Sequence, residues 1–102
     1  MNCLHTINQS ATQHQTVITQ ITALGTNDAV IFLEDGVYNA IASGPASQLI
    51  HESSARGVRF YAIETDLKAR GCAAIVHASI ELIHYEKFVE LSTTHSNICS
   101  WF

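Results

Sequence analysis

Three cysteines offer the strongest nucleophiles of this 102-residue chain: Cys3, Cys72 and Cys99. A thiol is most reactive at a helix N-terminus, where the helix dipole and the free N–H groups favour the thiolate. Cys3 instead belongs to a predicted strand, Cys72 follows a short predicted helix, and Cys99 lies near the end of the sequence. We therefore expect all three thiols to be buried or incidental.

The spacing of the cysteines and histidines does not predict a metal site. The cysteines are odd in number, widely spaced and without a C-x-x-C pair, which indicates free thiols in a reducing, cytosolic compartment. The six histidines form no H-x-x-x-H or H-E-x-x-H pair, so a metal site would need residues from distant parts of the chain to converge. The five isolated glycines form no phosphate-binding loop. We expect neither a metal nor a cofactor.

Carboxylates gather at two predicted strand ends. Glu34 and Asp35 follow an apolar strand, and Asp66 follows another, with Arg70 one helical turn later. Adjacent side chains on a strand point apart, so Glu34 and Asp35 are not predicted to form an acid–base dyad. Capping of the next turn explains Asp35 and Asp66 nearly as well as a functional role does, and Gly36 permits a tight bend or the close approach of a partner. Arg70 is expected to face solvent or to pair across an interface.

Hydrophobic periodicity predicts the elements that must position these residues. Strands are expected at residues 2–8, 29–33, 58–63 and 80–83, and residues 97–102 form an edge strand or a docking segment. Helices are expected at residues 13–24, 37–42, 46–56, 67–70 and 85–94, with Gly25 and Gly71 just past the ends of two of them.

Alternation of strands and helices defines the predicted fold. It is typical of an α/β protein with three α/β/α layers and a mostly parallel sheet of four to five strands. The length fits one domain spanning residues 1–102. Sites in such folds lie at the carboxyl ends of the strands, which directs attention to the turns at residues 8–12, 34–37 and 64–67.

Composition excludes some functions and favours a partner. Five basic against nine acidic residues give a net charge of −4, which argues against direct binding of a nucleic acid. The apolar runs fall far short of the roughly 18 residues of a membrane-spanning helix. Only 14% of the residues are charged and 47% are hydrophobic, so we expect some apolar surface to meet another protein. Tyr38 and Trp101 are candidate interface aromatics, although either could belong to the core.

Several segments together resemble the TusB/DsrH family. They are L-H-T at residues 4–6, L-E-D-G-V-Y at 33–38, Y-A-I-E-T-D-L-K-A-R-G at 61–71, H-Y-E-K-F-V-E-L at 84–91, and the ending with H-S at 95–96 and S-W at 100–101. The resemblance covers nearly the whole chain. The E-D-G-V-Y and D-L-K-A-R-G runs are far more specific together than either is alone.

The resemblance implies a small subunit of a sulfur-relay complex. TusB-like proteins assemble with TusC-like and TusD-like sister subunits into a heterohexamer that passes persulfide sulfur toward 2-thiouridine at the wobble position of tRNA. In the sister subunit the persulfide-bearing cysteine lies in a turn that corresponds to residues 64–66 here, where this chain has no cysteine. The chain therefore resembles the non-carrier subunit, which would meet tRNA only indirectly and has no expected membrane contact.

Three alternatives remain open from the sequence. DsrH-like members belong to the DsrEFH complex of sulfur oxidation, but they typically carry a cysteine in the first helix, where Thr19 and Gln20 stand here, and this favours the tRNA-thiolation branch. The chain could otherwise be a stand-alone homo-oligomer that binds a small anion. If this chain itself carried persulfide, Cys72 and Cys99 would be the candidates.

Overall fold

The computed structural model describes residues 3–11 and 16–101, in which strands and helices alternate. The strands are β1 (Cys3–Ile7), β2 (Ala29–Phe32), β3 (Arg59–Ile63), β4 (Ile80–Ile83) and β5 (Asn97–Trp101). The α-helices are α1 (Thr16–Thr22), α2 (Ser47–Ala55), α3 (Glu64–Ala69) and α4 (Tyr85–Thr94), and two 3-10 helices are η1 (Glu34–Ala40) and η2 (Ala73–Ile75). The predicted helix start at Gln13 and the terminal Phe102 lie outside the described residues.

Within these residues five strands form one parallel sheet in the order β4-β3-β2-β1-β5. The chain winds outward from β1 to β4 and then returns to the other side of β1, where β5 forms the edge. The C-terminal segment is therefore an edge strand, the first of the two roles predicted for it. In its register with β1, Cys99 lies opposite His5 and Trp101 lies opposite Ile7.

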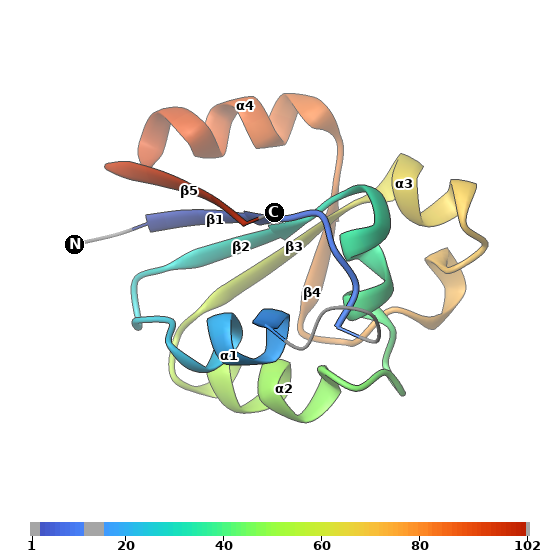
Figure 1. Ribbon diagram of the computed structural model, residues 1–102. Helices are drawn as coiled ribbons and strands as arrows, with labels where there is room; N and C mark the ends of the chain where they lie inside the picture. The colour runs from blue at the N-terminus through green and yellow to red at the C-terminus, as the bar shows by residue number, and fades with distance from the viewer. Residues whose placement is uncertain (1–2, 12–15, 102) are drawn as a thin grey trace.

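Helices cover both faces of the sheet, with α1 and α2 on one side and α4 on the other (Figure 1). The side chains of β2 alternate between the two cores: Val30 and Phe32 pack with the residues of α1 and α2, and Ala29 and Ile31 pack with Leu91 of α4. All four residues of β2 are buried, as expected of a strand that is covered on both faces. The predicted three-layer α/β/α sandwich is confirmed.

The segment after β2 differs in detail from the prediction. It is a 3-10 helix that begins at Glu34, whereas the sequence predicted a helix over residues 37–42. The cause is a close approach to the end of β1, because a Cβ atom on Gly36 would lie 2.0 Å from the Ile7 carbonyl oxygen. The buried side chain of Asn39 fixes the same turn, since its Oδ1 accepts from the Ala11 N–H at 2.8 Å and its Nδ2 donates to the Gln9 carbonyl at 2.8 Å.

Two glycines predicted to end helices behave differently. Gly71 follows α3 with a φ of +70°, the left-handed conformation typical of a residue just past a helix C-terminus. Gly25 does not have this role, because α1 ends at Thr22 and Gly25 instead donates its N–H to the Asp28 carboxylate at 2.9 Å.

Across the described residues, no helix has the length and apolar character needed to cross a membrane.

We predict that Gly36→Ala lowers the free energy of unfolding by more than about 2 kcal/mol. The added methyl group would overlap the Ile7 carbonyl oxygen, which the pairing of β1 holds in place, and such overpacking destabilises the fold. Gly25→Ala is the matched control, since its Cβ would meet only ordinary contacts at 3.7 Å. Urea unfolding of both variants measures the difference. Equal stability of the two variants would contradict the close approach.

Candidate functional site

Four of the polar residues singled out in the sequence meet at the carboxyl ends of β2 and β3. We call Glu34, Asp35, Asp66 and Arg70 the strand-end cluster. The Glu34 backbone N–H donates to Asp66 Oδ2 at 2.8 Å, which joins the turn after β2 to the first turn of α3. The Tyr85 hydroxyl also approaches Asp66 Oδ2, at 3.5 Å. Parallel strands bring these segments together because their carboxyl ends share one edge of the sheet.

Arg70 holds the two turns together inside this chain. Its Nε and Nη2 atoms each lie 3.0 Å from Asp35 Oδ1, and its Nη1 donates to the Asp66 carbonyl oxygen at 3.3 Å. Arg70 therefore has a partner within its own chain, which the sequence did not predict, and its interface role stays a prediction. The Arg70 side chain is 25% exposed and that of Asp35 60% exposed, so the ion pair is screened and contributes about 1 kcal/mol or less.

The helix-capping roles predicted for Asp35 and Asp66 are also corrected. In the described part of the chain the N-cap residues of η1 and α3 are Leu33 and Ile63, and neither makes a side-chain capping hydrogen bond. Asp35 binds Arg70, and Asp66 accepts from Glu34 rather than from its own helix. The capping prediction was wrong because each carboxylate binds a residue of the neighbouring turn. Sequence spacing does not show which turns are neighbours.

Glu34 has a strained backbone. Its φ is +51°, in the left-handed region that costs a residue with a side chain about 1–2 kcal/mol. Its side chain is directed to Asn8 Nδ2 at 3.5 Å and so diverges from that of Asp35, as predicted for adjacent residues. Among the described residues, the buried Oδ1 of Asn8 has no hydrogen-bond partner. Strain of this kind persists where the surrounding structure enforces it and is frequent at functional positions.

The charge of Asp66 reaches the phenol of Tyr85. Burial and then the nearby Asp66 carboxylate raise the pKa of Tyr85 above its usual value, because both disfavour the phenolate. Tyr85 is nevertheless 48% exposed, and Tyr38 of η1 is 38% exposed. The strand-end cluster is thus an acidic, arginine-bridged surface with exposed aromatic rings on neighbouring elements.

Cys72 lies close to this cluster in sequence but not on its surface. Its side chain is only 5% exposed and packs in the core that α1 and α2 share. Its Sγ donates to the Arg70 carbonyl at 3.3 Å and its N–H to the Leu67 carbonyl at 2.9 Å. The thiol is directed inward, as the sequence led us to expect.

Cys99 lies at the opposite edge of the sheet, where its Sγ is 2.7 Å from Cys3 Sγ. Burial, the hydrogen bond to Cys99 and the charge of Asp28 raise the pKa of Cys3 to about 12, so this thiol is protonated at neutral pH. A ring nitrogen of His5 completes a group whose ligand atoms lie within 4.8 Å of one another. The sequence did not predict this grouping. Trp101 enters the same edge through its backbone pairing with Ile7.

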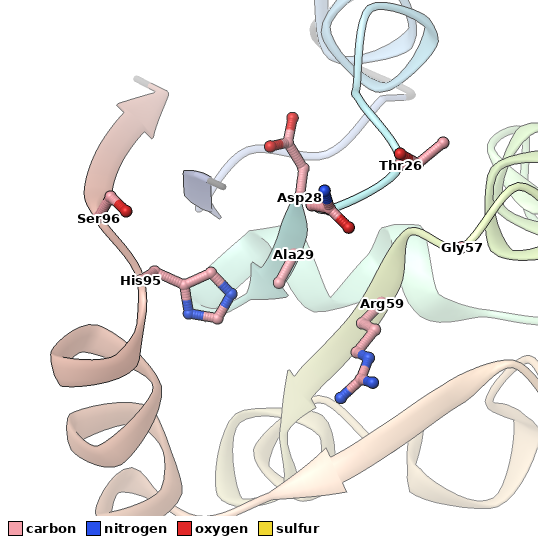
Figure 2. Close-up of a pocket in the computed structure, with 8 residues that line it drawn as sticks. Thr26, Asp28, Ala29, Gly57, Arg59, His95 and Ser96 are labelled. Atoms are coloured by element: carbon pink, nitrogen blue, oxygen red, sulfur yellow. The ribbon is translucent and has the colours of Figure 1, made fainter. Parts of the chain in front are cut away.

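A groove of about 540 Å³ lies at the amino ends of β2 and β3, away from the strand-end cluster (Figure 2). It is lined by Thr26, Asn27, Asp28, Ala29, Gly57, Arg59, His95 and Ser96. His95 follows the last residue of α4, and its Nδ1 lies 2.8 Å from the Leu91 carbonyl oxygen of that helix.

Asp28 connects this groove to β1. Its carboxylate accepts from the Cys3 N–H at 3.0 Å and the Gly25 N–H at 2.9 Å, and it lies 3.2 Å from His5 Nε2. Burial alone would raise the pKa of Asp28, but the hydrogen bonds from Gly25, His5 and Cys3 outweigh it and lower the pKa. Sequence reasoning missed Asp28, whose only signal was its place just before an apolar strand.

Comparison with known proteins settles the family. The family described as DsrH like protein matches residues 9–98 of the chain. This chain belongs to the DsrH-like family. The relatives of this DsrH-like chain include Protein TusB of Pectobacterium parmentieri, 33% identical over 98 residues, which are 96% of this chain and 99% of the relative. Protein TusB of Pectobacterium carotovorum is 35% identical over the same shares of the two chains.

Solved structures share the fold of this DsrH-like chain. A protein of unknown function from Methanobacterium thermoautotrophicum superposes with a TM-score of 0.77 at 17% identity, covering 98% of this chain and 97% of that one. The ychN protein of E. coli also gives a TM-score of 0.77, at 10% identity and with the same coverage. At these identities the likeness extends to the fold alone.

We predict that Glu34→Gly leaves the DsrH-like chain as stable or stabilises it by up to about 1 kcal/mol, because glycine removes the left-handed strain and keeps the N–H that binds Asp66. Glu52→Gly, inside α2, is the control and should cost about 1 kcal/mol. Thermal and urea unfolding compare the two variants. If Glu34→Gly lowered the free energy of unfolding as much as Glu52→Gly does, the backbone strain at Glu34 would be refuted.

We predict that Asp28→Asn costs the DsrH-like chain about 1–3 kcal/mol at pH 7, because an amide cannot accept from all three of the groups that surround the carboxylate. The folded-state pKa of Asp28 is lowered, so its stabilisation is complete above the unfolded pKa of about 3.9 and is lost as the pH falls through the folded value. Urea unfolding between pH 7 and pH 3 should show a shallower acid decline in the variant. Asp35→Asn is the exposed control, with an expected cost of about 1 kcal/mol or less.

Proposed function

We propose that this DsrH-like chain is a non-carrier subunit of a cytosolic sulfur-relay complex that supports 2-thiolation of the tRNA wobble uridine. Its partners are TusC-like and TusD-like sister subunits in a heterohexamer. The observation that carries the proposal is the chemistry of the strand-end cluster. It holds three carboxylates and an arginine at the edge of the sheet where sites of this fold form, and no thiol belongs to it.

The positions of the cysteines support a role that carries no sulfur. The thiol of Cys72 is directed into the core, and Cys99 lies on β5, at the far edge of the sheet from α3 and β4. The turn that corresponds to the carrier cysteine of the sister subunit holds Glu64 and Asp66, whose negative charges would disfavour a thiolate or persulfide anion beside them. This chain would then shape the complex around the sulfur-carrying site of its sister.

The exposed apolar side chains support a partner interface. Val89 of α4 is 62% exposed and Ile98 of β5 is 52% exposed, and α4 is the only helix among the described residues that lies on that face of the sheet (Figure 1). Tyr38 and Tyr85 add exposed aromatic area beside the strand-end cluster, and such rings carry much of the energy of interfaces. The remaining interface candidates are Asp35, Gly36, Arg70 and Trp101. Gly36 contributes indirectly, because its close approach to β1 fixes the position of η1.

Charge supports an indirect relation to tRNA. The net charge of the chain is −4, and within it the strand-end cluster places three carboxylates against one guanidinium, a surface that repels a phosphate backbone. The same charge disfavours the alternative of a small-anion site at these turns. The choice of tRNA thiolation over sulfur oxidation rests on residues 19 and 20 of α1. DsrH-like members of the DsrEFH complex typically carry a cysteine there, whereas this chain has Thr19, which is exposed, and Gln20.

Co-expression with the TusC-like and TusD-like chains, followed by native mass spectrometry with and without a sulfur donor, tests the proposal. We expect a stable hetero-complex in which the mass of one added sulfur atom appears on a sister chain alone. Sulfur transfer should be unchanged in Cys72→Ser and Cys99→Ser. Sulfur mapped to either cysteine, or a homo-oligomer that ignores the sister chains, would overturn the proposal.

Glu34→Gly serves as the interface variant in the same experiment, because it removes the carboxylate without a predicted loss of stability. We expect it to weaken the complex by about tenfold, equivalent to about 1.4 kcal/mol. Glu52→Gln, on the exposed side of α2, is the matched control and should leave complex formation unchanged. Equal complex formation by the two variants would remove the strand-end cluster from the interface.

A further inference from the structure

Cys3, His5 and Cys99 converge although 96 positions separate the two cysteines. Parallel pairing of β1 with β5 sets His5 opposite Cys99, and Cys3 lies two residues before His5 on the same face of β1. The two sulfur atoms and one ring nitrogen of His5 all lie within 4.8 Å of one another. The strand order thus builds the long-range convergence that the local spacing of histidines and cysteines did not predict.

We propose that Cys3, His5 and Cys99 bind a thiophilic d¹⁰ cation, for which Zn²⁺ is the representative. Two thiolates and an imidazole are one of the ligand sets that bind zinc in proteins with a fourth position left to water. Zinc–sulfur bonds of about 2.3 Å and zinc–nitrogen bonds of about 2.0 Å set tetrahedral ligand atoms about 3.5–3.8 Å apart. The two sulfur atoms, now 2.7 Å apart, reach that spacing by moving about 1 Å, which is within the range of cysteine side-chain rotation.

Asp28 supplies the second contact that a histidine ligand needs. Its Oδ2 lies 3.2 Å from His5 Nε2, and its Oδ1 accepts from the N–H of Cys3 at 3.0 Å. A carboxylate in contact with the imidazole orients the ring and increases its basicity, an arrangement common around zinc. Asp28 therefore positions His5 through the imidazole ring and Cys3 through the backbone N–H of that cysteine.

Charge and burial fit an ion with an open coordination position. Binding releases one proton from each thiol to solvent, and the two thiolates neutralise the divalent cation, so the ion and its three ligands together carry no net charge. His5 is buried, whereas Cys3 and Cys99 are half-buried at the edge of the sheet. Solvent can therefore provide the fourth tetrahedral ligand. The site lies away from the strand-end cluster, and the inference does not depend on the proposed function.

Titration of the reduced, tag-free chain with Co²⁺ and then Zn²⁺ under argon tests the site. We expect one Co²⁺ per chain, with a thiolate charge-transfer band in the near ultraviolet and the intense visible bands of tetrahedral cobalt. Zn²⁺ should displace the cobalt and raise the melting temperature, because the ion ties β5 to β1 only in the folded state. Absence of the thiolate band would overturn the proposal.

Variants separate this site from adventitious binding. Cys99→Ser should abolish the thiolate band, His5→Gln should weaken binding by at least about tenfold, and Asp28→Asn should weaken it by about 10–100-fold. Cys72→Ser is the matched control and should bind as the original chain does, because its thiol is directed into the core. Circular dichroism checks that each variant is folded. If Cys99→Ser does not fold, His5→Gln still decides the test.

Two results would sink the proposal. The first is equal Co²⁺ binding by Cys99→Ser and Cys72→Ser, which would assign the ion to another site. The second is an intact mass two hydrogen atoms lower under reducing conditions, with the loss mapped to Cys3 and Cys99 and no metal bound. That result would make the pair a disulfide instead of a ligand set.

Discussion

The contact between Gly36 and the end of β1 is the constraint on which the strand-end cluster depends. Ile7 ends β1, and its carbonyl oxygen accepts from the Leu33 N–H at 3.1 Å while leaving room only for hydrogen at Gly36. The chain can pass this point only by turning tightly, and Glu34 takes up the left-handed backbone that the turn requires. Asp66, which accepts from the Glu34 N–H, and Arg70, which binds Asp35, then hold the turn from the side of α3. The acidic surface is thus a product of backbone crowding.

The two ends of the sheet differ in chemistry for a related reason. At the carboxyl ends, neighbouring turns bring carboxylates and a guanidinium together at an exposed surface, where charged groups remain hydrated. At the amino end of β1, Asp28 is shielded from solvent and its charge is stabilised by three donors from the surrounding segments. The thiols lie only at this second end or in the core, so the sulfur chemistry and the acidic surface of the chain are spatially separate.

Local patterns predicted the elements well and the contacts between them poorly. The buried run of β2, the amphipathic α4 and the glycine after α3 each carried a local signal, and the structure has them where the sequence placed them. The pairing of Asp35 with Arg70 was missed because it joins turns 35 residues apart. The meeting of His5 with Cys99 was missed because it depends on β5 returning to the side of β1, an order that periodicity does not encode.

That return has a consequence for how the protein is made. Strand β1 is the first to leave the ribosome, yet one of its two neighbours is the last of the five strands to be synthesised. The segment that joins them contains the other three strands, so β1 can pair with β5 only after nearly all of the described chain has been synthesised. Until then β1 carries a row of unpaired backbone groups along one side, which is the usual template for unwanted association. Pairing with β5 therefore covers this side of β1 and makes the short strand β5 the edge of the sheet in its place.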